Sequence, residues 1–175
     1  MLTVTFFILV LNLIVLPQSI KENVDRAIEN CFGKSIRIEF DKLKIENELK
    51  KSIEKEVGQK FFSEEVYLYR IQNESDLIGY GLLDNVYGKS LPITFLVLYD
   101  YRGTILCSEI IKYREPYGGA VKNKEWNNQF KGKNVNSDLL VGKDINGISG
   151  ATISVYSVTK GIKKLTLLLD KILDR

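Results

Sequence analysis

The sequence contains no histidine, and its 175 residues include only two cysteines, Cys31 and Cys107. Without histidine, the chain cannot form a Ser-His-Asp triad or use imidazole as a general acid or base. Most zinc sites also need histidine, and the two cysteines lack Cys-x-x-Cys spacing, so no metal site is predicted. The favoured interpretation of the cysteines is two partly buried thiols; a disulfide would require the fold to bring them together.

The chain also lacks an excess of charge of one sign, since 25 basic residues balance 22 acidic ones. A net charge of +3 is too small to indicate nucleic-acid binding or strong electrostatic attraction to a membrane surface. The hydrophobic content of 45% and the length are typical of one domain with its own core.

Only the N-terminus carries a long uncharged apolar run, from Leu2 to Leu16, which ends before Pro17. The run is shorter than the about 20 residues that a membrane span needs, and it suits the apolar region of a signal peptide. No Lys or Arg precedes it, so an uncleaved anchor is the alternative, and a buried core helix is the least favoured interpretation. Residues 1–19 are therefore predicted to be a signal peptide or membrane anchor, which places the remainder outside the cytoplasm.

Residues 20–58 are predicted to form an N-terminal, mainly helical part. Apolar spacing predicts a short amphipathic helix over residues 21–33, and alternation predicts a strand over residues 35–40. A second helix is expected over residues 41–58, with Asp41 as its N-cap and Gly58 at its end. Its apolar stripe consists of Leu49, Ile53 and Val57.

The middle of the chain is predicted to be an antiparallel β-meander, because short turn segments separate its apolar runs. Gly79 and Gly81 within the second run indicate a bend or a close backbone approach. The four runs span residues 65–73, 77–86, 92–100 and 104–115.

The C-terminal segment, residues 152–174, has apolar residues at alternating spacings of four and three, which predicts a long amphipathic helix. Three of the lysines in this segment are interpreted as a solvated face: Lys160, Lys163 and Lys164. The expected fold is α+β: an antiparallel β-meander packed with helices, ending in a long C-terminal helix. We expect one domain over residues 20–175, with its core in residues 60–175.

Two catalytic motifs fail in the segment that precedes this helix. Gly142 and Gly147 have the separation of a phosphate-binding P-loop, but Ile148 stands where the lysine is required. A nucleophile elbow would need glycine in place of Ala151. A hydrolase using a hydroxyl of this segment would also lack a base, because there is no histidine and no lysine is suitably spaced.

The segment Ser149–Thr152, Ser-Gly-Ala-Thr, opens the predicted C-terminal helix. Helix N-termini bind phosphate well, because their first N–H groups are unpaired and the helix dipole is positive there. Gly150 and Ala151 would let a bulky group approach the backbone. The plainer alternative is that Ser149 or Thr152 only caps the helix, which is the commoner role of such residues.

The segment Asn146–Lys164 resembles the flavinylation motif of the FMN-binding domain family. That family includes flavin subunits of Rnf-type complexes and of sodium-pumping NADH:quinone reductases, and small exported flavoproteins. Its motif reads roughly Asp-Gly-x-Ser-Gly-Ala-Thr, and the last threonine carries FMN through a phosphoester. The matching residue here is Thr152. A second block, Tyr113–Lys133, resembles the family's Glu, Pro/Gly turn and Gln-Phe-x-Gly-Lys segment, so the resemblance covers about residues 60–172.

The resemblance implies FMN as cofactor, with a set of candidate binding residues. One departure concerns Asn146, since the family usually has aspartate there, and the resemblance implies that the flavin transferase recognises this aspartate. Glu115 would orient the ring or a backbone loop, and Trp126 would pack near the ring or belong to the core. The full set is Thr152, Ser149, Gly150, Ala151, Asn146, Glu115, Gly118, Gly119 and Trp126.

The resemblance implies an exported or membrane-anchored flavoprotein that relays electrons and is not a standalone catalyst. Its expected partners are a flavin transferase and membrane or extracytoplasmic redox proteins, in the periplasm or at the cell surface. A membrane binding or sensory module of the same fold, without flavin, is the alternative.

Overall fold

The computed structural model describes residues 18–173. The prediction of a signal peptide or anchor falls mostly on residues 1–17 and lies outside the described residues. The helices are α1 (Gln18–Phe32), α2 (Asn47–Val57), α3 (Lys124–Asn127) and α4 (Thr152–Leu173), with 3-10 turns η1 (Gly119–Lys122) and η2 (Asn128–Phe130). The strands are β1 (Arg37–Lys44), β2 (Glu65–Asn73), β3 (Asp76–Tyr87), β4 (Pro92–Asp100) and β5 (Ile105–Lys112).

The five strands form one sheet in the order β1-β2-β3-β4-β5, and every neighbouring pair is antiparallel. The sequence order equals the spatial order because short turns join the strands from β2 to β5. The predicted meander and the α+β class with a long C-terminal helix are therefore confirmed.

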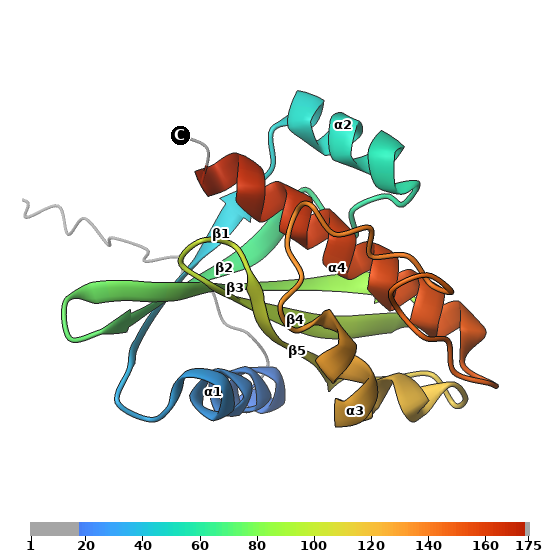
Figure 1. Cartoon of the computed structure of the whole chain (residues 1–175), viewed down its shortest axis with the longest axis horizontal. Helices are drawn as coiled ribbons and strands as arrows, with labels where there is room; N and C mark the ends of the chain where they lie inside the picture. The colour runs from blue at the N-terminus through green and yellow to red at the C-terminus, as the bar shows by residue number, and fades with distance from the viewer. Residues whose placement is uncertain (1–17, 174–175) are drawn as a thin grey trace, which may run out of the picture.

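Helices cover both faces of the sheet (Figure 1). The central strands are apolar on both sides, so alternate residues of β3 and β4 point into two separate cores. Leu82 and Phe95 belong to the core beneath α4 and α2, whereas Leu83 and Leu96 pack with α1 on the other face. Within residues 18–173, no helix is long and apolar enough to cross a membrane.

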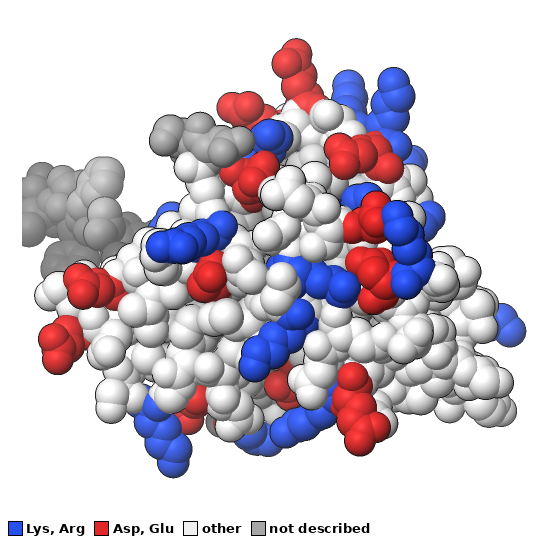
Figure 2. Space-filling model, viewed as in Figure 1, with Lys and Arg blue, Asp and Glu red and all other residues white. Residues whose placement is uncertain are grey.

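Charged side chains of both signs are interspersed on the face shown in Figure 2, and they are dense over α2. This agrees with the sequence of α2, which alternates acidic and basic residues around its apolar stripe. The buried stripe of Ile53 and Val57, and the left-handed Gly58 at its end (φ 65°), are confirmed.

The start of α2 differs from the prediction. Asp41 is not its N-cap, because β1 continues to Lys44 and the helix begins at Asn47. Asp41 lies opposite Leu68 of β2, and its carboxylate accepts a hydrogen bond from Arg70 at 2.6 Å. Pairing with β2 therefore extends the strand beyond residues 35–40, the alternating segment from which the strand was predicted.

The close approach expected at the β3 glycines is confirmed at Gly79. A Cβ atom added there would lie 2.3 Å from the backbone oxygen of Tyr99 and 2.6 Å from the ring of Phe32. Any side chain at this position would therefore separate α1 from the sheet.

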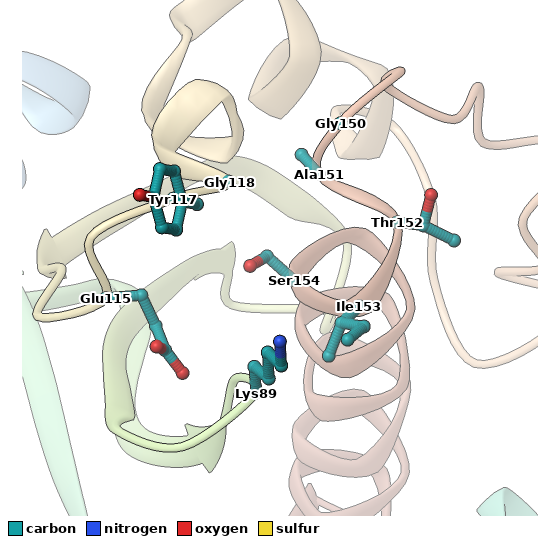
Figure 3. A pocket seen from close by; sticks show the side chains of 9 residues that line it. All are labelled: Lys89, Glu115, Tyr117, Gly118, Gly150, Ala151, Thr152, Ile153 and Ser154. Carbon is teal, nitrogen blue, oxygen red and sulfur yellow. The ribbon is translucent and has the colours of Figure 1, made fainter.

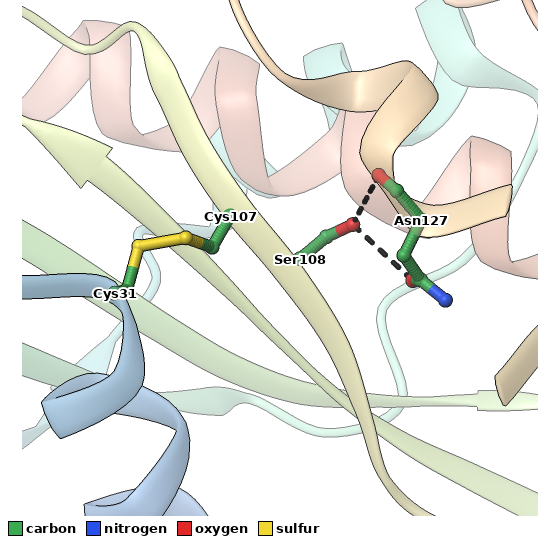
Figure 4. Close-up of a disulfide and its surroundings, with 4 residues drawn as sticks. All are labelled: Cys31, Cys107, Ser108 and Asn127. Atoms are coloured by element: carbon green, nitrogen blue, oxygen red, sulfur yellow. Dashed lines mark hydrogen bonds between the residues drawn. A yellow bond between two sulfur atoms is a disulfide. The ribbon is translucent and has the colours of Figure 1, made fainter. Parts of the chain in front are cut away.

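The interpretation of the cysteines as free thiols is wrong. Cys31 at the end of α1 and Cys107 in β5 form a disulfide across a sequence separation of 76, with their Cα atoms 6.3 Å apart (Figure 4). The bond joins α1 to the sheet at the edge of the core that this helix covers. The two cysteines are far apart in sequence, so only the fold reveals their pairing.

The interpretation of Lys164 as part of a solvated face is also wrong. Its side chain is 0% exposed, and its Nζ lies 3.4 Å from Oδ2 of Asp84 in β3. The same Nζ donates a hydrogen bond to the carbonyl oxygen of Lys60 at 3.0 Å. Desolvation lowers the pKa of Lys164 and raises the pKa of Asp84, each opposed by attraction to the other. Lys160, by contrast, is exposed.

Candidate functional site

The first turn of α4 is built from small residues. Gly150 has a φ of +77°, a left-handed conformation that favours glycine, and it turns the chain into the helix. Ala151 is buried, and its carbonyl accepts the first helical bond from Val155 N at 2.9 Å. The N–H groups of a helix's first turn have no intrahelical acceptor, and within this described helix the first turn holds no acidic residue. An anion is therefore favoured at this end.

The Pro/Gly loop after β5 lies against this turn. Gly118 has a φ of +79°, and an added Cβ would lie 2.8 Å from the Tyr113 hydroxyl and 3.1 Å from the Ser154 hydroxyl. Those two hydroxyls are hydrogen-bonded at 2.9 Å, and the Tyr113 O–H also lies within bonding distance of the Tyr117 carbonyl oxygen. Glycine is required at position 118 because this network occupies the space of a side chain.

A cavity of about 270 Å³ opens between the loop and the helix (Figure 3). Tyr117, which is 84% exposed, stands at its edge, and the side chain of Thr152 points away from Glu115 and Tyr117. Five of the predicted residues meet here: Glu115, Gly118, Gly150, Ala151 and Thr152. The other lining residues are Lys89, Tyr117, Ile153 and Ser154.

Glu115 acts on a backbone turn. Its Oε1 accepts hydrogen bonds from the N–H groups of Ser90 and Leu91, the latter at 2.8 Å. The N–H groups of Leu91 and Ser90 hold the pKa of Glu115 below its usual value, so the carboxylate stays ionised at neutral pH. The turn brings Lys89 to the cavity, where its amino group points toward the start of α4 (Figure 3).

A second cavity of about 290 Å³ lies on the other side of Thr152. Its lining includes Ser149 and the exposed Tyr156 together with Val141, Gly147, Ile148, Thr152 and Val155. Thr152 is exposed and is shared by both cavities, so its hydroxyl is accessible to a bound group or to another protein.

Three predicted residues line neither cavity. Trp126 is 5% exposed and packs edge-to-face on Phe130 at 5.2 Å between ring centroids, so it occupies the core, the alternative role given for it above. Its indole N–H donates to the carbonyl oxygen of Asn146 at 2.8 Å. The side-chain oxygen of Gln129 accepts a hydrogen bond from the Asn146 backbone N–H at 2.8 Å. Asn146 itself is exposed. Gly119 begins η1.

Asp144, the acidic residue nearest to Asn146 in the sequence, has a structural role. Its carboxylate accepts the N–H groups of Leu139 and Leu140 and lies 3.3 Å from Lys133 Nζ. Despite desolvation, which acts in the opposite direction, these backbone hydrogen bonds and Lys133 hold the pKa of Asp144 below its usual value. Asp144 is thus committed to the 139–145 turn and does not replace a carboxylate at position 146.

Sequence reasoning missed Lys89, Tyr113 and Ser154. The turn signal at residues 87–90 was visible, but its contact with Glu115 spans 25 positions and depends on strand pairing. The two hydroxyls likewise lie 41 positions apart.

Residues 88–166 match the FMN-binding domain family. This part of the chain is similar to an FMN-binding domain. The match contains the complete wall of the first cavity, from Lys89 to Ser154, and its cofactor is FMN.

The chain is also 30% identical over 125 residues to one of the subunits of the Na⁺-translocating ferredoxin:NAD⁺ oxidoreductase complex of Acetobacterium woodii. The aligned region covers 64% of this chain and 60% of that protein. The chain therefore spans less than two thirds of the length of this relative.

The first cavity suits the phosphate end of FMN. Its wall combines a lysine, the start of a 22-residue helix and the small residues Gly118, Gly150 and Ala151. The one lining carboxylate, on Glu115, is already hydrogen-bonded to two N–H groups, which reduces its repulsion of an anion.

Proposed function

We propose that the chain is an exported or membrane-anchored flavoprotein that holds FMN through a phosphoester to Thr152 and relays electrons between redox partners. The observation that carries the proposal is the position of Thr152. It is an exposed hydroxyl at the first residue of α4, within a matched FMN-binding domain and between two cavities.

The attachment requires an activated flavin phosphate and an enzyme that delivers it. Thr152 Oγ1 forms a bond to the phosphorus of a flavin dinucleotide, its proton leaves, and the second nucleotide departs as the monophosphate. The adduct therefore has the mass of the chain plus FMN less one water. The exposed side chain of Asn146 and the exposed Thr152 leave the segment accessible to such a transferase.

The residues of the chain bind and orient the cofactor. First-turn N–H groups of α4 and the Lys89 ammonium favour the phosphate, and Tyr117 offers an exposed ring at the cavity edge. FMN supplies the redox chemistry when bound, and the protein sets its orientation and potential. Glu115 is committed to the 88–91 turn and is poorly placed to move a proton to a substrate, which supports electron relay over standalone catalysis.

The disulfide supports the extracytoplasmic setting. Disulfides persist in secreted and periplasmic proteins and are rare in the reducing cytosol. Cys31 and Cys107 join two elements across 76 positions, as expected for a chain that folds in an oxidising compartment. The apolar run at residues 2–16 supports the same location. Membrane redox proteins are the proposed partners, in line with the relative being part of an oxidoreductase complex.

Intact-mass measurement tests the attachment. The chain is exported with a flavin transferase present, alongside the variants Thr152→Ala and Ser52→Ala, the second at an exposed serine of α2 that lines neither cavity. We expect one FMN adduct on the unchanged chain and on the Ser52→Ala control, and none on Thr152→Ala. An unmodified mass for the unchanged chain, with transferase and flavin supplied, would contradict the covalent link.

The variant Asn146→Asp then tests whether the family's aspartate limits the reaction. A larger modified fraction in this variant would show that the exposed side chain at position 146 contributes to transferase recognition. An unchanged fraction would show that asparagine serves equally well there.

A further inference from the structure

The turn between β3 and β4, residues 88–91, is held in place by a carboxylate from another part of the chain. Glu115 Oε1 accepts the N–H groups of Ser90 and Leu91, and the turn itself closes through Gly88 N to the Leu91 carbonyl oxygen at 3.0 Å. An added Cβ at Gly88 would lie 2.7 Å from that same Oε1. Glycine at position 88 therefore permits Glu115 to reach the turn.

The consequence of this contact is the placement of Lys89. Its side chain extends from the 88–91 turn into the cavity. Its amino group points toward the first turn of α4 rather than toward Glu115 (Figure 3). Lys89 is the cation among the lining residues, and the lining carboxylate is already satisfied by N–H donors. The ammonium is therefore available to a ligand anion.

We propose that Lys89 is a specificity residue of this site, contacting the FMN phosphate and so selecting FMN over the unphosphorylated flavin, riboflavin. Glu115 is then a positioning residue that holds the turn carrying Lys89, and does not touch the flavin. This inference rests on the proposed function, because it assumes that flavin occupies the cavity beside Thr152.

Flavin titration of the full chain tests the assignment. The chain is produced without a flavin transferase, so that flavins bind reversibly, and FMN and riboflavin are titrated separately by fluorescence quenching. A hydrogen bond to a charged group is worth about 1.5–3 kcal/mol, which corresponds to a change of about tenfold or more in affinity. We expect Lys89→Met to weaken FMN binding by about tenfold or more and to leave riboflavin binding unchanged.

Three further variants test the effect of removing any surface lysine, the need for a positive charge at position 89, and the role of Glu115 in positioning Lys89. Lys131→Met removes an exposed lysine that lines neither described cavity, and it should bind both flavins as the unchanged chain does. Lys89→Arg keeps the cation and should restore most of the preference for FMN. Glu115→Ala frees the turn, and it should reduce FMN affinity without changing riboflavin affinity.

Equal FMN affinities for Lys89→Met and Lys131→Met would overturn the inference while leaving the flavin site intact. Equal losses for FMN and riboflavin in Lys89→Met would also overturn it, because they would indicate a contact with the ring or a structural effect. If the unchanged chain binds neither flavin and gains no FMN adduct with the transferase, the proposed function falls and this inference falls with it.

Discussion

Replacing Lys164 with methionine tests how α4, the helix that carries Thr152, is fixed to the sheet. Methionine keeps most of the length of lysine and removes its charge. In the native protein Nζ is fully buried, 3.4 Å from Asp84 Oδ2, 3.0 Å from the Lys60 carbonyl oxygen and 4.4 Å from the centre of the Phe61 ring. The substitution therefore leaves a buried carboxylate without its counter-ion and a carbonyl without a donor.

The expected cost is about 3–5 kcal/mol of unfolding free energy, the usual result of breaking a buried ion pair on one side. Asp84 has a side chain only 3% exposed, and its Oδ2 has no hydrogen-bond partner among the described residues. Removing both charges in Asp84→Leu/Lys164→Met should cost less than the single change, because no isolated charge remains buried. The neighbouring control Lys163→Met, at a more exposed lysine, should cost less than about 0.5 kcal/mol.

The pH dependence follows from the direction of the Asp84 pKa. Burial raises this pKa in the folded protein, and removing Lys164 removes the main attraction that opposes the rise. A carboxyl whose folded pKa exceeds its unfolded value favours the folded state when protonated, and this advantage is lost as the pH rises. The loss of unfolding free energy in Lys164→Met should therefore be smaller at pH 5 than at pH 7. The difference should be about 1.36 kcal/mol for each unit by which the folded and unfolded pKa values of Asp84 differ between these two pH values.

Chemical denaturation at pH 5 and pH 7, followed by the fluorescence of the single, buried Trp126, measures these differences. A deficit below about 1 kcal/mol with no change between the two pH values would refute the reasoning. So would a double variant less stable than the single one, because the pair would then not be the source of the cost.

Two further predictions concern the disulfide and the Pro/Gly loop. Cys31→Ser/Cys107→Ser should lower the unfolding free energy by about 4 kcal/mol, because the bond closes a long loop across 76 positions; an equal denaturation midpoint with and without the bond would contradict this. Gly118→Ala should reduce FMN loading, since its Cβ would meet the Tyr113 hydroxyl at 2.8 Å; Gly132→Ala, at a similar φ of +80° with open space around it, is the matched control and should load normally.

Local pattern was sufficient for much of the fold. The bounds of β2 and β4 and the start of α4 follow from apolar runs and turn residues that are adjacent in sequence. The extension of β1 past Asp41 depends on pairing with β2, and the disulfide and the Lys164–Asp84 pair depend on how helices pack on the sheet. Those contacts leave no periodic signal in the sequence.

The site likewise contains residues that were predicted from short segments and residues whose positions depend on the fold. The motif at the start of α4 and the Pro/Gly loop were visible as short segments, and the fold brings them together at Gly118 and Ser154. Trp126 shows the opposite outcome, because it belongs to an aromatic pair in the core, and its indole N–H donates a hydrogen bond to the backbone of Asn146 in the motif. A role for Lys89 could not be predicted, because its position depends on the turn that Glu115, which follows β5, holds through hydrogen bonds.

The two groups of residues that determine the site should respond differently to substitution. Lys89 and Glu115 act from exposed loops, so changing them should alter flavin affinity with little effect on stability. The position of Thr152 depends instead on contacts further along α4. At Gly161 an added Cβ would lie 2.8 Å from both Phe95 and Val86, and Lys164 follows one turn later at its ion pair. Because a helix moves as a rigid element, a change there should shift Thr152 and lower stability together.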